Sequence, residues 1–427
     1  MAAVPSSVLK VFQPLAIVIA AALFTNSYSQ KPSKNKPTII AAGVVLDGKG
    51  GKILNTRIVI ENGIIVALNP KAEPVDFDLR GFTVMPGWID AHTHISWGFG
   101  PDGKNAGNTD TTQWGALAAA SNAYATLLGG FTTIQSVGSR FDLRLREAID
   151  LGIVPGPRIL TSLDPIAQSN LTPGEIRALV RKRKEEGADL IKIMASGGMT
   201  APGLTITEDQ LNAACDEANK LGLRSLVHAN TGAVKVATLA GCSQIEHGRM
   251  AIEEELKLMA EKQTYFDPQG GLLLENYFVN RAKFAGTPFF PDKEEVLTQL
   301  YHQIIPSERD LIRRASKVPH LKIVFGSDAV AGMHGKNAEE FIHRVRDGGV
   351  DPMTALVSAN WMGAQALRLS DQIGTIAPGM QADIIAICGD PLKDITVVRN
   401  VVFVMKGGIV YKNLNCEGGG EKAMKRK

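Results

Sequence analysis

The sequence predicts an α/β fold: a (β/α)8 TIM barrel joined to a small β-sandwich domain that both chain ends form. Two observations predict it. In the middle of the chain, eight short apolar runs of strand length alternate with helical patterns. At both ends, short strand patterns instead follow one another through tight turns. With 427 residues, of which 44% are hydrophobic, the chain is long enough to bury the core of a barrel and of a second unit.

The barrel is expected over residues 84–370. Helical patterns such as Glu175–Glu186, Thr207–Leu221 and Ile252–Lys262 separate most of the apolar runs. No fixed-period repeat is visible, which argues against a solenoid. The predicted strands are Thr83–Asp90, Thr132–Val137, Arg158–Ser162, Leu190–Ala195, Ser225–Ala229, Ser243–Gly248, Thr264–Pro268 and Lys322–Asp328.

The β-sandwich domain is expected from residues 37–83 and 371–415. The turn dipeptides Asn62-Gly63 and Gly407-Gly408 lie between its strand patterns. Residues 43–49 resemble a phosphate-binding loop, but Gly50 follows where Ser or Thr is needed, so a hairpin turn is the better interpretation. The predicted strands are Thr38–Leu46, Arg57–Glu61, Ile64–Leu68, Ala382–Cys388, Val397–Lys406 and Ile409–Tyr411.

Residues 1–29 have the pattern of a signal peptide. Lys10 precedes an apolar run over residues 12–24, and Ser27 and Ser29 occupy the −3 and −1 positions of a cleavage site before Gln30. The run is too short for a comfortable membrane span, and an uncleaved anchor is the alternative. We therefore expect an exported protein, periplasmic or extracellular, with no stable membrane span after signal cleavage.

Charge and cysteine content narrow the function classes further. The net charge of +3 is too small and too dispersed to indicate a nucleic-acid partner. No pair among the four cysteines has metal-binding or redox spacing. An exported protein could join two of them, and the sequence leaves their pairing open. Cys215 and Cys242 are interpreted as small buried side chains.

Two histidines follow the first predicted barrel strand. His92 and His94 are two residues apart, so on a strand their side chains point to the same face and can reach one metal ion. A lone His-x-His motif also occurs in surface segments. Barrel active sites, however, lie at the C-terminal ends of the strands, and this position indicates a metal site.

Lys192 lies inside the apolar fourth strand, where a charged lysine is costly to bury. Its amine could reach outward to solvent or pair with a carboxylate. It could also react with carbon dioxide to form an anionic carbamate that bridges two metal ions. The residues alone do not decide among the three.

Further candidate ligands end the fifth, sixth and eighth strands: His228, His247 and Asp328. Each histidine alone is explained equally well as a hydrogen-bonded core residue, whereas imidazoles at consecutive strand ends favour a shared site. The carboxylate after the eighth strand needs a partner, which a metal supplies. With the first two histidines and the lysine, these side chains suit zinc or another divalent transition metal. The histidines at 302, 320 and 343 fit surface roles better.

Several of these segments resemble one known family. Residues 86–94, Pro-Gly-Trp-Ile-Asp-Ala-His-Thr-His, resemble the first-strand signature of the amidohydrolase superfamily. Residues 191–198 are similar to the fourth-strand segment of a branch with imidazolonepropionase-related enzymes, Xaa-Pro and other dipeptidases, and ochratoxin-type amidases. Residues 245–248, 326–328 and 376–383 match later motifs of that branch. The resemblance covers nearly all of the chain after the signal peptide.

The resemblance implies a metal-dependent amidohydrolase with two divalent ions, expected to be zinc. It implies one ion on His92, His94 and Asp328, and a carbamylated Lys192 that bridges to a second ion on His228 and His247. A metal-bridging hydroxide would attack the amide carbonyl of a dipeptide or an N-acyl amino acid. Asp328 would be the catalytic general acid and base.

The chain departs from that branch at two places. Asn230 stands near the position where some dipeptidases carry an aromatic residue that contacts the substrate carboxylate. The second strand, with Ile134–Val137, lacks the Arg-Asp pair of many relatives. Substrate identity therefore does not carry over. Weaker substrate-binding candidates are Gly197, Asn230 and His334.

Two other hypotheses stay open. A one-metal site would make the protein a cyclic-amide hydrolase or a deaminase, but such sites typically lack the lysine at 192. A non-catalytic binding protein would be expected to have lost ligands, and none is missing. The expected partner is a small-molecule or dipeptide-like substrate. Whether the protein forms a homo-oligomer is not indicated.

Overall fold

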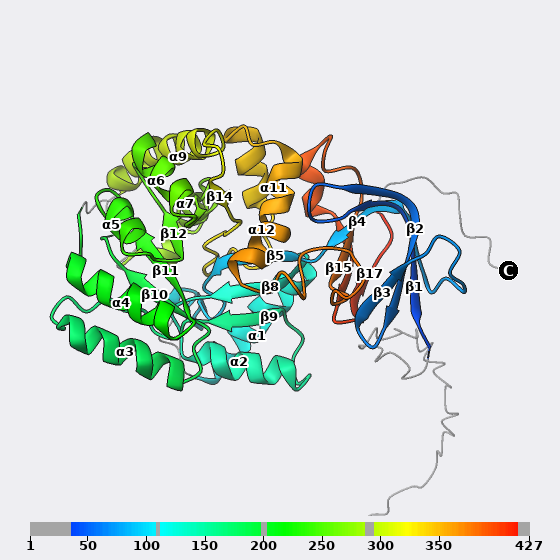
Figure 1. The fold of residues 1–427 in the computed structure, drawn as a ribbon, viewed down its shortest axis with the longest axis horizontal. Coiled ribbons are helices and arrows are strands. Elements are labelled where there is room, and N and C mark those ends of the chain that lie inside the picture. The colour runs from blue at the N-terminus through cyan, green and yellow to red at the C-terminus, as the bar shows by residue number, and fades with distance from the viewer. Residues whose placement is uncertain (1–35, 108–111, 198–202, 287–293, 417–427) are drawn as a thin grey trace, which may run out of the picture.

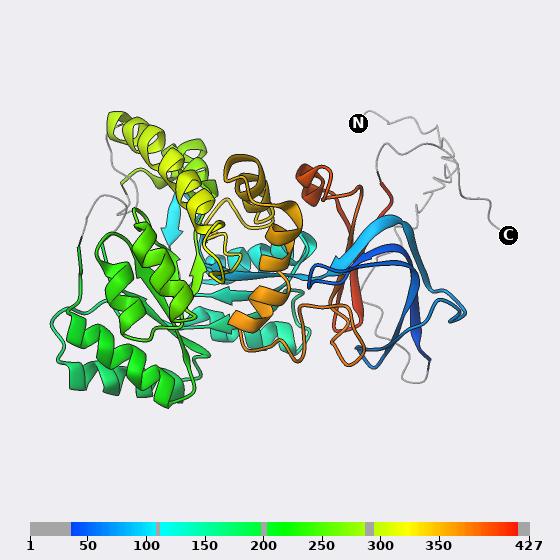
Figure 2. The ribbon, with the colours of Figure 1, turned by 45° about the horizontal axis from the view of Figure 1, so that its top comes forward.

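A computed structural model describes residues 36–107, 112–197, 203–286 and 294–416. The chain forms a large mixed α/β part and a smaller sheet beside it, on the right in Figures 1 and 2. The predicted signal peptide lies outside the described residues. None of the helices in the described ranges is both long and apolar enough to cross a membrane.

The large part is a TIM-barrel-type α/β fold, in which the strands run in chain order through two parallel sheets. Sheet order is β5-β8-β9 in one and β10-β11-β12-β13-β14 in the other. Backbone bridges join the two sheets at Ile166 with Ile193 and at Thr93 with Ala329. The strands are β5 (Trp88–Thr93), β8 (Phe131–Ser136), β9 (Arg158–Thr161), β10 (Leu190–Met194), β11 (Arg224–Ala229), β12 (Gln244–His247), β13 (Tyr265–Asp267) and β14 (Lys322–Ile323).

Helices cover the outer face of these strands (Figure 1). Successive side chains of β10 point to opposite faces of the sheet. Ile193 points outward, into a core that it shares with Val180 of α3 and Leu211 of α4. Lys192 therefore lies on the inner side. The helices are α1 (Gln113–Leu128), α2 (Phe141–Asp150), α3 (Pro173–Glu185), α4 (Glu208–Lys220), α5 (Ala233–Leu239), α6 (Glu253–Glu261), α7 (Leu272–Val279), α8 (Arg281–Phe284), α9 (Glu294–Ala315), α10 (Glu339–Ile342), α11 (Pro352–Ser358) and α12 (Trp361–Ala366).

The smaller part is a seven-stranded sheet with the order β17-β16-β15-β4-β1-β2-β3. Its pairing of β4 with β15 brings the two chain ends together, and the sheet encloses its own apolar core around Ile58, Val84 and Phe403. The strands are β1 (Thr38–Leu46), β2 (Lys52–Glu61), β3 (Ile64–Leu68), β4 (Phe77–Pro86), β15 (Ile384–Ile387), β16 (Val401–Lys406) and β17 (Ile409–Asn413).

The expected strand Thr83–Asp90 divides between the two parts, so that prediction is wrong in its first half. Residues 83–86 end β4 of the smaller sheet, and β5 of the large part begins only at Trp88. Gly87 lies between them. A Cβ there would overlap the Thr132 side chain, so only glycine allows the chain to pass this closely from one sheet to the other. The strand expected over Val397–Lys406 begins only at Val401, because residues 397–399 belong to a 3₁₀ turn over Ile395–Arg399.

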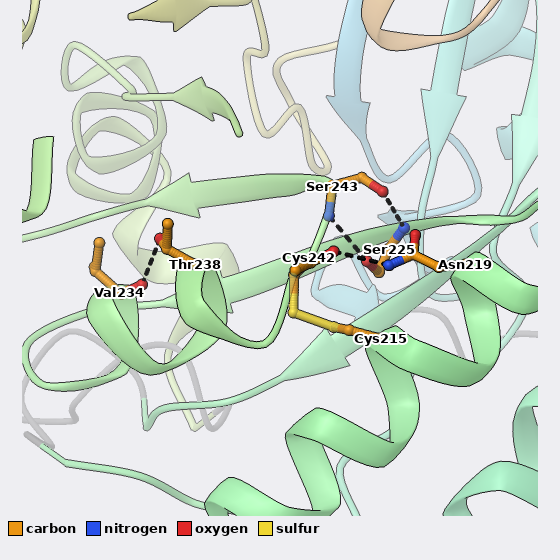
Figure 3. The surroundings of a disulfide bond; sticks show 8 residues. Cys215, Asn219, Ser225, Val234, Thr238, Cys242 and Ser243 are labelled. Carbon is orange, nitrogen blue, oxygen red and sulfur yellow. Dashed lines mark hydrogen bonds between the residues drawn. A yellow bond between two sulfur atoms is a disulfide. The ribbon is translucent and has the colours of Figure 1, made fainter. Parts of the chain in front are cut away.

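Two disulfides correct the interpretation of the cysteines. Cys215 of α4 bonds Cys242, which precedes β12, with their Cα atoms 5.1 Å apart (Figure 3). Reciprocal hydrogen bonds between Ser225 and Ser243 hold the neighbouring strand starts together. The second disulfide joins Cys388 to Cys416. The fold brings each pair of cysteines close together. The spacing of the four cysteines along the chain does not show which pairs form.

Candidate functional site

The predicted ligands meet where the parallel strands end. His92 lies on β5, with His94 just beyond its end, and Asp328 follows β14. The backbone N–H of Asp328 donates to the carbonyl oxygen of His92 over 2.8 Å, which fixes one segment on the other. His247, the last residue of β12, and Asp328 have φ values of 65° and 52°. Strained backbone of this kind persists where the surrounding structure holds a functional side chain in place.

Three of the predicted ligands form a compact group. The Nε2 atoms of His94 and His92 lie 3.1 Å and 3.4 Å from Asp328 Oδ1. One ligand atom from each residue falls within 4.8 Å of the others. Burial alone would raise the pKa of Asp328, but the charge of His92 and the hydrogen bond from His94 hold it well below its usual range. Asp328 is therefore an ionised carboxylate.

Lys192 reaches the same group from β10. Its side chain is buried, and its Nζ lies 3.2 Å from His92 Nε2. Burial lowers the pKa of Lys192, only partly opposed by the carboxylates of Glu246 and Asp328. A lowered pKa favours the neutral amine, which is the form that can act as a nucleophile.

His228 and His247 complete the set from β11 and β12. Their ring centroids are 4.4 Å apart, and the His247 ring lies 5.5 Å from that of His92. Burial lowers the pKa of His228 to about 3 and lowers that of His247 well below its usual value. Both are therefore neutral imidazoles, the protonation state in which histidine binds a metal.

A second layer of acidic and amide groups holds the histidines in place. His92 Nδ1 lies 2.6 Å from Glu246 Oε2 and 3.7 Å from Asp267 Oδ2. Gln269 Oε1 accepts a hydrogen bond from His247 Nδ1 over 2.6 Å, and Gln269 Nε2 donates to Asp267 Oδ2. The buried Arg344 pairs with Asp267 at 2.8 Å. This layer fixes the ring nitrogens that face the site.

The donor set fits a divalent transition metal. Nε2 of His92 faces the group while its Nδ1 is turned to a carboxylate, which is how metal-bound histidines are usually oriented. Burial and the Lys192 charge act to lower the pKa of His92, but Glu246 and Asp328 outweigh them and raise it to about 10. The field that favours a proton on His92 also favours a metal cation beside it.

Of the three weaker substrate-binding candidates, two border the ligand group and one does not. The Gly197 carbonyl oxygen lies 3.1 Å from His228 Nε2 and accepts from Asn230 Nδ2 at 3.3 Å, so both residues border the site. His334 turns to the backbone instead, with its Nε2 3.1 Å from the carbonyl oxygen of Trp97. The structure thus supports two of the three as neighbours of the ligand group.

Sequence reasoning missed the supporting carboxylates. Glu246 is adjacent to His247, and Asp267 ends an apolar strand as Asp328 does, so the same strand-end signal was available. The glycine at position 326 also reflects the position of the Asp267 carboxylate. A Cβ at this position would overlap the Asp267 carboxylate, which explains a glycine two residues before Asp328. Gln269 and Arg344 gave no signal, because only the fold brings them near.

Known proteins resemble this chain in sequence and in fold. Residues 83–410 match the sequence model of the amidohydrolase family. Ochratoxinase of Aspergillus niger is 26% identical over 447 aligned residues, which cover 91% of this chain and 89% of the relative. A crystal structure of a Xaa-Pro dipeptidase with methionine bound in its active site has a TM-score of 0.78 and 31% identity, covering 88% of this chain and 100% of that chain. A prolidase complexed with N-methylphosphonate-L-proline has a TM-score of 0.76 and 28% identity, with 88% and 100% covered. The chain therefore belongs to the amidohydrolase family, is Xaa-Pro dipeptidase-like, and is a hydrolase of carbon–nitrogen bonds.

Proposed function

We propose that this protein is a metal-dependent amidohydrolase that cleaves an amide or peptide-like C–N bond in a dipeptide or an N-acyl amino acid. One observation carries the proposal. Side chains from the ends of β5, β10, β11 and β12 and from the segment after β14 converge as four imidazoles, a buried amine and an ionised carboxylate. Such a set has little structural purpose without a cation.

His92, His94 and Asp328 would hold one divalent ion, and His228 and His247 a second. Lys192, carbamylated on Nζ, would bridge them, and its burial and lowered pKa support that modification. When bound, such ions lower the pKa of water and polarise an amide carbonyl. Zinc suits this mixture of nitrogen and oxygen ligands.

Asp328 would move the proton. It is ionised at neutral pH, so it can accept a proton from the attacking water and then give it to the departing nitrogen. His94, 3.1 Å from the same oxygen, holds the carboxylate in position. Asn230 and Gly197 would border the substrate beside His228.

We also propose the finer architecture and the location of the protein. The bridges of Thr93 with Ala329 and of Ile166 with Ile193 support a closed (β/α)8 barrel over residues 84–370. A composite β-sandwich domain would be formed by residues 37–83 and 371–415. Two disulfides support export to an oxidising compartment, periplasmic or extracellular, after removal of residues 1–29.

The proposal is tested by hydrolysis of a panel that contains L-alanyl-L-proline, other dipeptides and N-acetyl-L-amino acids. We expect release of free amino acid, loss of that activity after dialysis against a chelator, and its return when Zn²⁺ is added. Hydrolysis that is unaffected by complete metal removal would contradict metal dependence. No hydrolysis of any member by the metal-loaded protein would contradict the proposed reaction.

A one-metal enzyme of the same fold is the second candidate, a cyclic-amide hydrolase or a deaminase. It is favoured by the compactness of His92, His94 and Asp328, whose ligand atoms already lie within 4.8 Å of one another. Lys192 argues against it, since a single ion on that group needs no bridging ligand. The metal content per chain separates the two candidates.

A further inference from the structure

A buried arginine begins β11 and forms no ion pair within the part of the chain that the structure describes. Arg224 is only 5% exposed. Its Nη1 donates to the side-chain oxygen of Gln135 and, at 3.3 Å, to the carbonyl oxygen of Ala366, and both acceptors are neutral. Its Nη2 is buried and has no hydrogen-bond partner in the described ranges. A buried guanidinium without a counter-charge is costly, so this side chain indicates an anionic ligand.

Arg224 lies on the inner side of the strands, at the end opposite to the metal-ligand group. Side chains alternate along β11, so Arg224 shares a face with Leu226 and His228. Leu226 packs on this inner side with Val137 and Leu190. Four residues of strand, about 13 Å, separate Arg224 from His228. The guanidinium therefore belongs to a different place in the fold from the ligand group.

Two further cations and a phenol lie at the same end of the strands. Tyr265 and Lys322 are the first residues of β13 and β14, and Lys322 Nζ lies 5.0 Å from the centroid of the Tyr265 ring. Arg368 donates to the carbonyl oxygen of Gly222, just before β11, at 2.8 Å. Burial raises the pKa of Tyr265, and the positive charges of Arg368 and Arg224 oppose that rise. The phenol is therefore close enough to both guanidinium groups to be affected by their charge.

The positive charge of this group is not neutralised by the carboxylates of the described residues. Burial lowers the pKa of Arg224 to about 10, and Asp189 is the one described carboxylate whose charge acts to raise it. Asp189 is itself paired with Arg146 at 2.6 Å and accepts from the backbone N–H of Thr161 at 2.8 Å. Arg368 adds a second positive charge beside Arg224. The group thus combines net positive charge with a buried donor that lacks an acceptor.

We infer that the N-terminal ends of β11, β13 and β14 form a binding site for one small inorganic anion, of the size of chloride, on Arg224 Nη2 with Tyr265 and Arg368 beside it. Such an ion supplies the missing negative charge and accepts hydrogen bonds from N–H and O–H donors. The burial of Arg224 favours a small ion over a large one. Because the unfolded chain does not bring these donors together, the ion binds the folded state and stabilises it.

The test measures urea unfolding of the metal-loaded protein while chloride is replaced stepwise by gluconate at constant ionic strength. Gluconate is too large for a buried site, so the series separates ion binding from general screening. One bound ion predicts that, above its dissociation constant, each tenfold increase in chloride raises the folding equilibrium constant about tenfold. A wild-type stability that does not depend on chloride would overturn the inference.

Variants at the same end of the strands test which residues hold the ion. Arg224→Gln should abolish the chloride dependence, and Tyr265→Phe, which removes only a hydroxyl, should shift it to about 3- to 10-fold higher chloride. Arg158→Gln is the matched control, because Arg158 is the first residue of β9 but is already paired with Asp383 at 2.9 Å. This control should keep the wild-type dependence. The same chloride dependence in Arg224→Gln as in wild type would contradict the site.

Wild-type crystals soaked in sodium bromide give a readout that does not depend on the folding of any variant. Anomalous scattering should place a bromide ion at hydrogen-bond distance from Arg224 Nη2. Crystals without bromide at this position would overturn the inference. Bromide there, together with a stability that ignores chloride, would mean an adventitious ion only and would overturn it as well. Neither readout involves a substrate, so failure of the proposed hydrolysis would leave this inference standing.

Discussion

Asp328 combines a strained backbone with a buried charge. Its φ of 52° is uncommon for an aspartate, and its carboxylate is held by His92 and His94. This combination is costly for stability and is explained by chemistry rather than by packing.

Asp328→Asn should therefore lower kcat by about 10²- to 10⁴-fold, because an amide of the same shape cannot accept and return a proton. Steady-state kinetics on the best substrate of the dipeptide panel measure this effect. The midpoint of thermal unfolding serves as the control for folding. Near wild-type kcat in a folded variant would show that Asp328 is not the proton carrier.

Glu246 is fully buried and acts on the site through His92 Nδ1 at 2.6 Å. Glu246→Gln removes the charge but keeps an oxygen acceptor. Metal affinity should fall by about 10- to 100-fold, as for other partners of metal-bound histidines. Competition with a chromogenic chelator measures the affinity, and an unchanged value would contradict the orienting role.

At the scale of residues, the sequence predicted the side chains that face the site but not the groups behind them. Strand-end position marked His92 and His94 as candidates, because the period of a strand and the polarity of a barrel are local rules. The orienting role of Glu246 depends on a contact with residue 92, which only the complete fold creates. Lys192 lies inside its strand and is ambiguous in sequence, and the burial of its side chain in the fold makes it informative.

The helices and strands were predicted best where local chemistry marks their ends. Helix α4 begins after Thr207, whose side chain accepts from the Gln210 N–H while the Gln210 side chain accepts from the Thr207 N–H. Expected and observed bounds therefore differ by one residue at each end, Thr207–Leu221 against Glu208–Lys220. Residues 83–90 contain no such end signal. Both halves of this apolar run form strands, so the sequence pattern does not show that one strand ends and another begins within it.

Helix α2 buries a carboxyl group, Asp142, which accepts from Thr161 Oγ1 at 3.3 Å. Burial raises the pKa of Asp142 to about 6, above its unfolded value of 3.8. The folded state then binds more protons than the unfolded state between these values. The stabilisation from this group is fully present below about pH 4 and is lost as the pH rises through 6.

Asp142→Asn removes this titration. The free energy of unfolding of the variant, relative to wild type, should rise by about 2 kcal/mol between pH 4 and pH 7. Urea unfolding at both pH values measures the difference, and any offset independent of pH cancels. A difference that stays constant with pH would contradict the raised pKa.

The disulfide between α4 and the start of β12 closes a loop with a sequence separation of 27. Replacing Cys215 and Cys242 together by alanine should lower the free energy of unfolding by about 3 kcal/mol, because the unfolded chain regains entropy. Denaturant unfolding of the variant and of the oxidised wild type gives the value. Equal stability of the two proteins would show that the bond contributes nothing, and reduced wild type should resemble the variant.

The whole molecule joins chain segments that lie far apart in sequence. Ile385 of β15 pairs with Met85 of β4, so the smaller sheet is assembled only after both ends of the chain have reached it. The sequence predicted β structure at each end from turn dipeptides, but strand order across such a distance has no local signal. The same limit applies to the pairing of the cysteines.

Metal content per chain tests the central claim most directly, that six side chains from five strand ends form a two-metal site. Purified wild-type protein and Lys192→Ala are compared by elemental mass spectrometry after equilibration with Zn²⁺ and removal of excess metal. The account predicts about two ions per wild-type chain, and loss of at least one ion together with hydrolytic activity in Lys192→Ala. Two retained ions and full activity in that variant would contradict the bridging role of Lys192, and a metal-free active wild type would contradict the site itself.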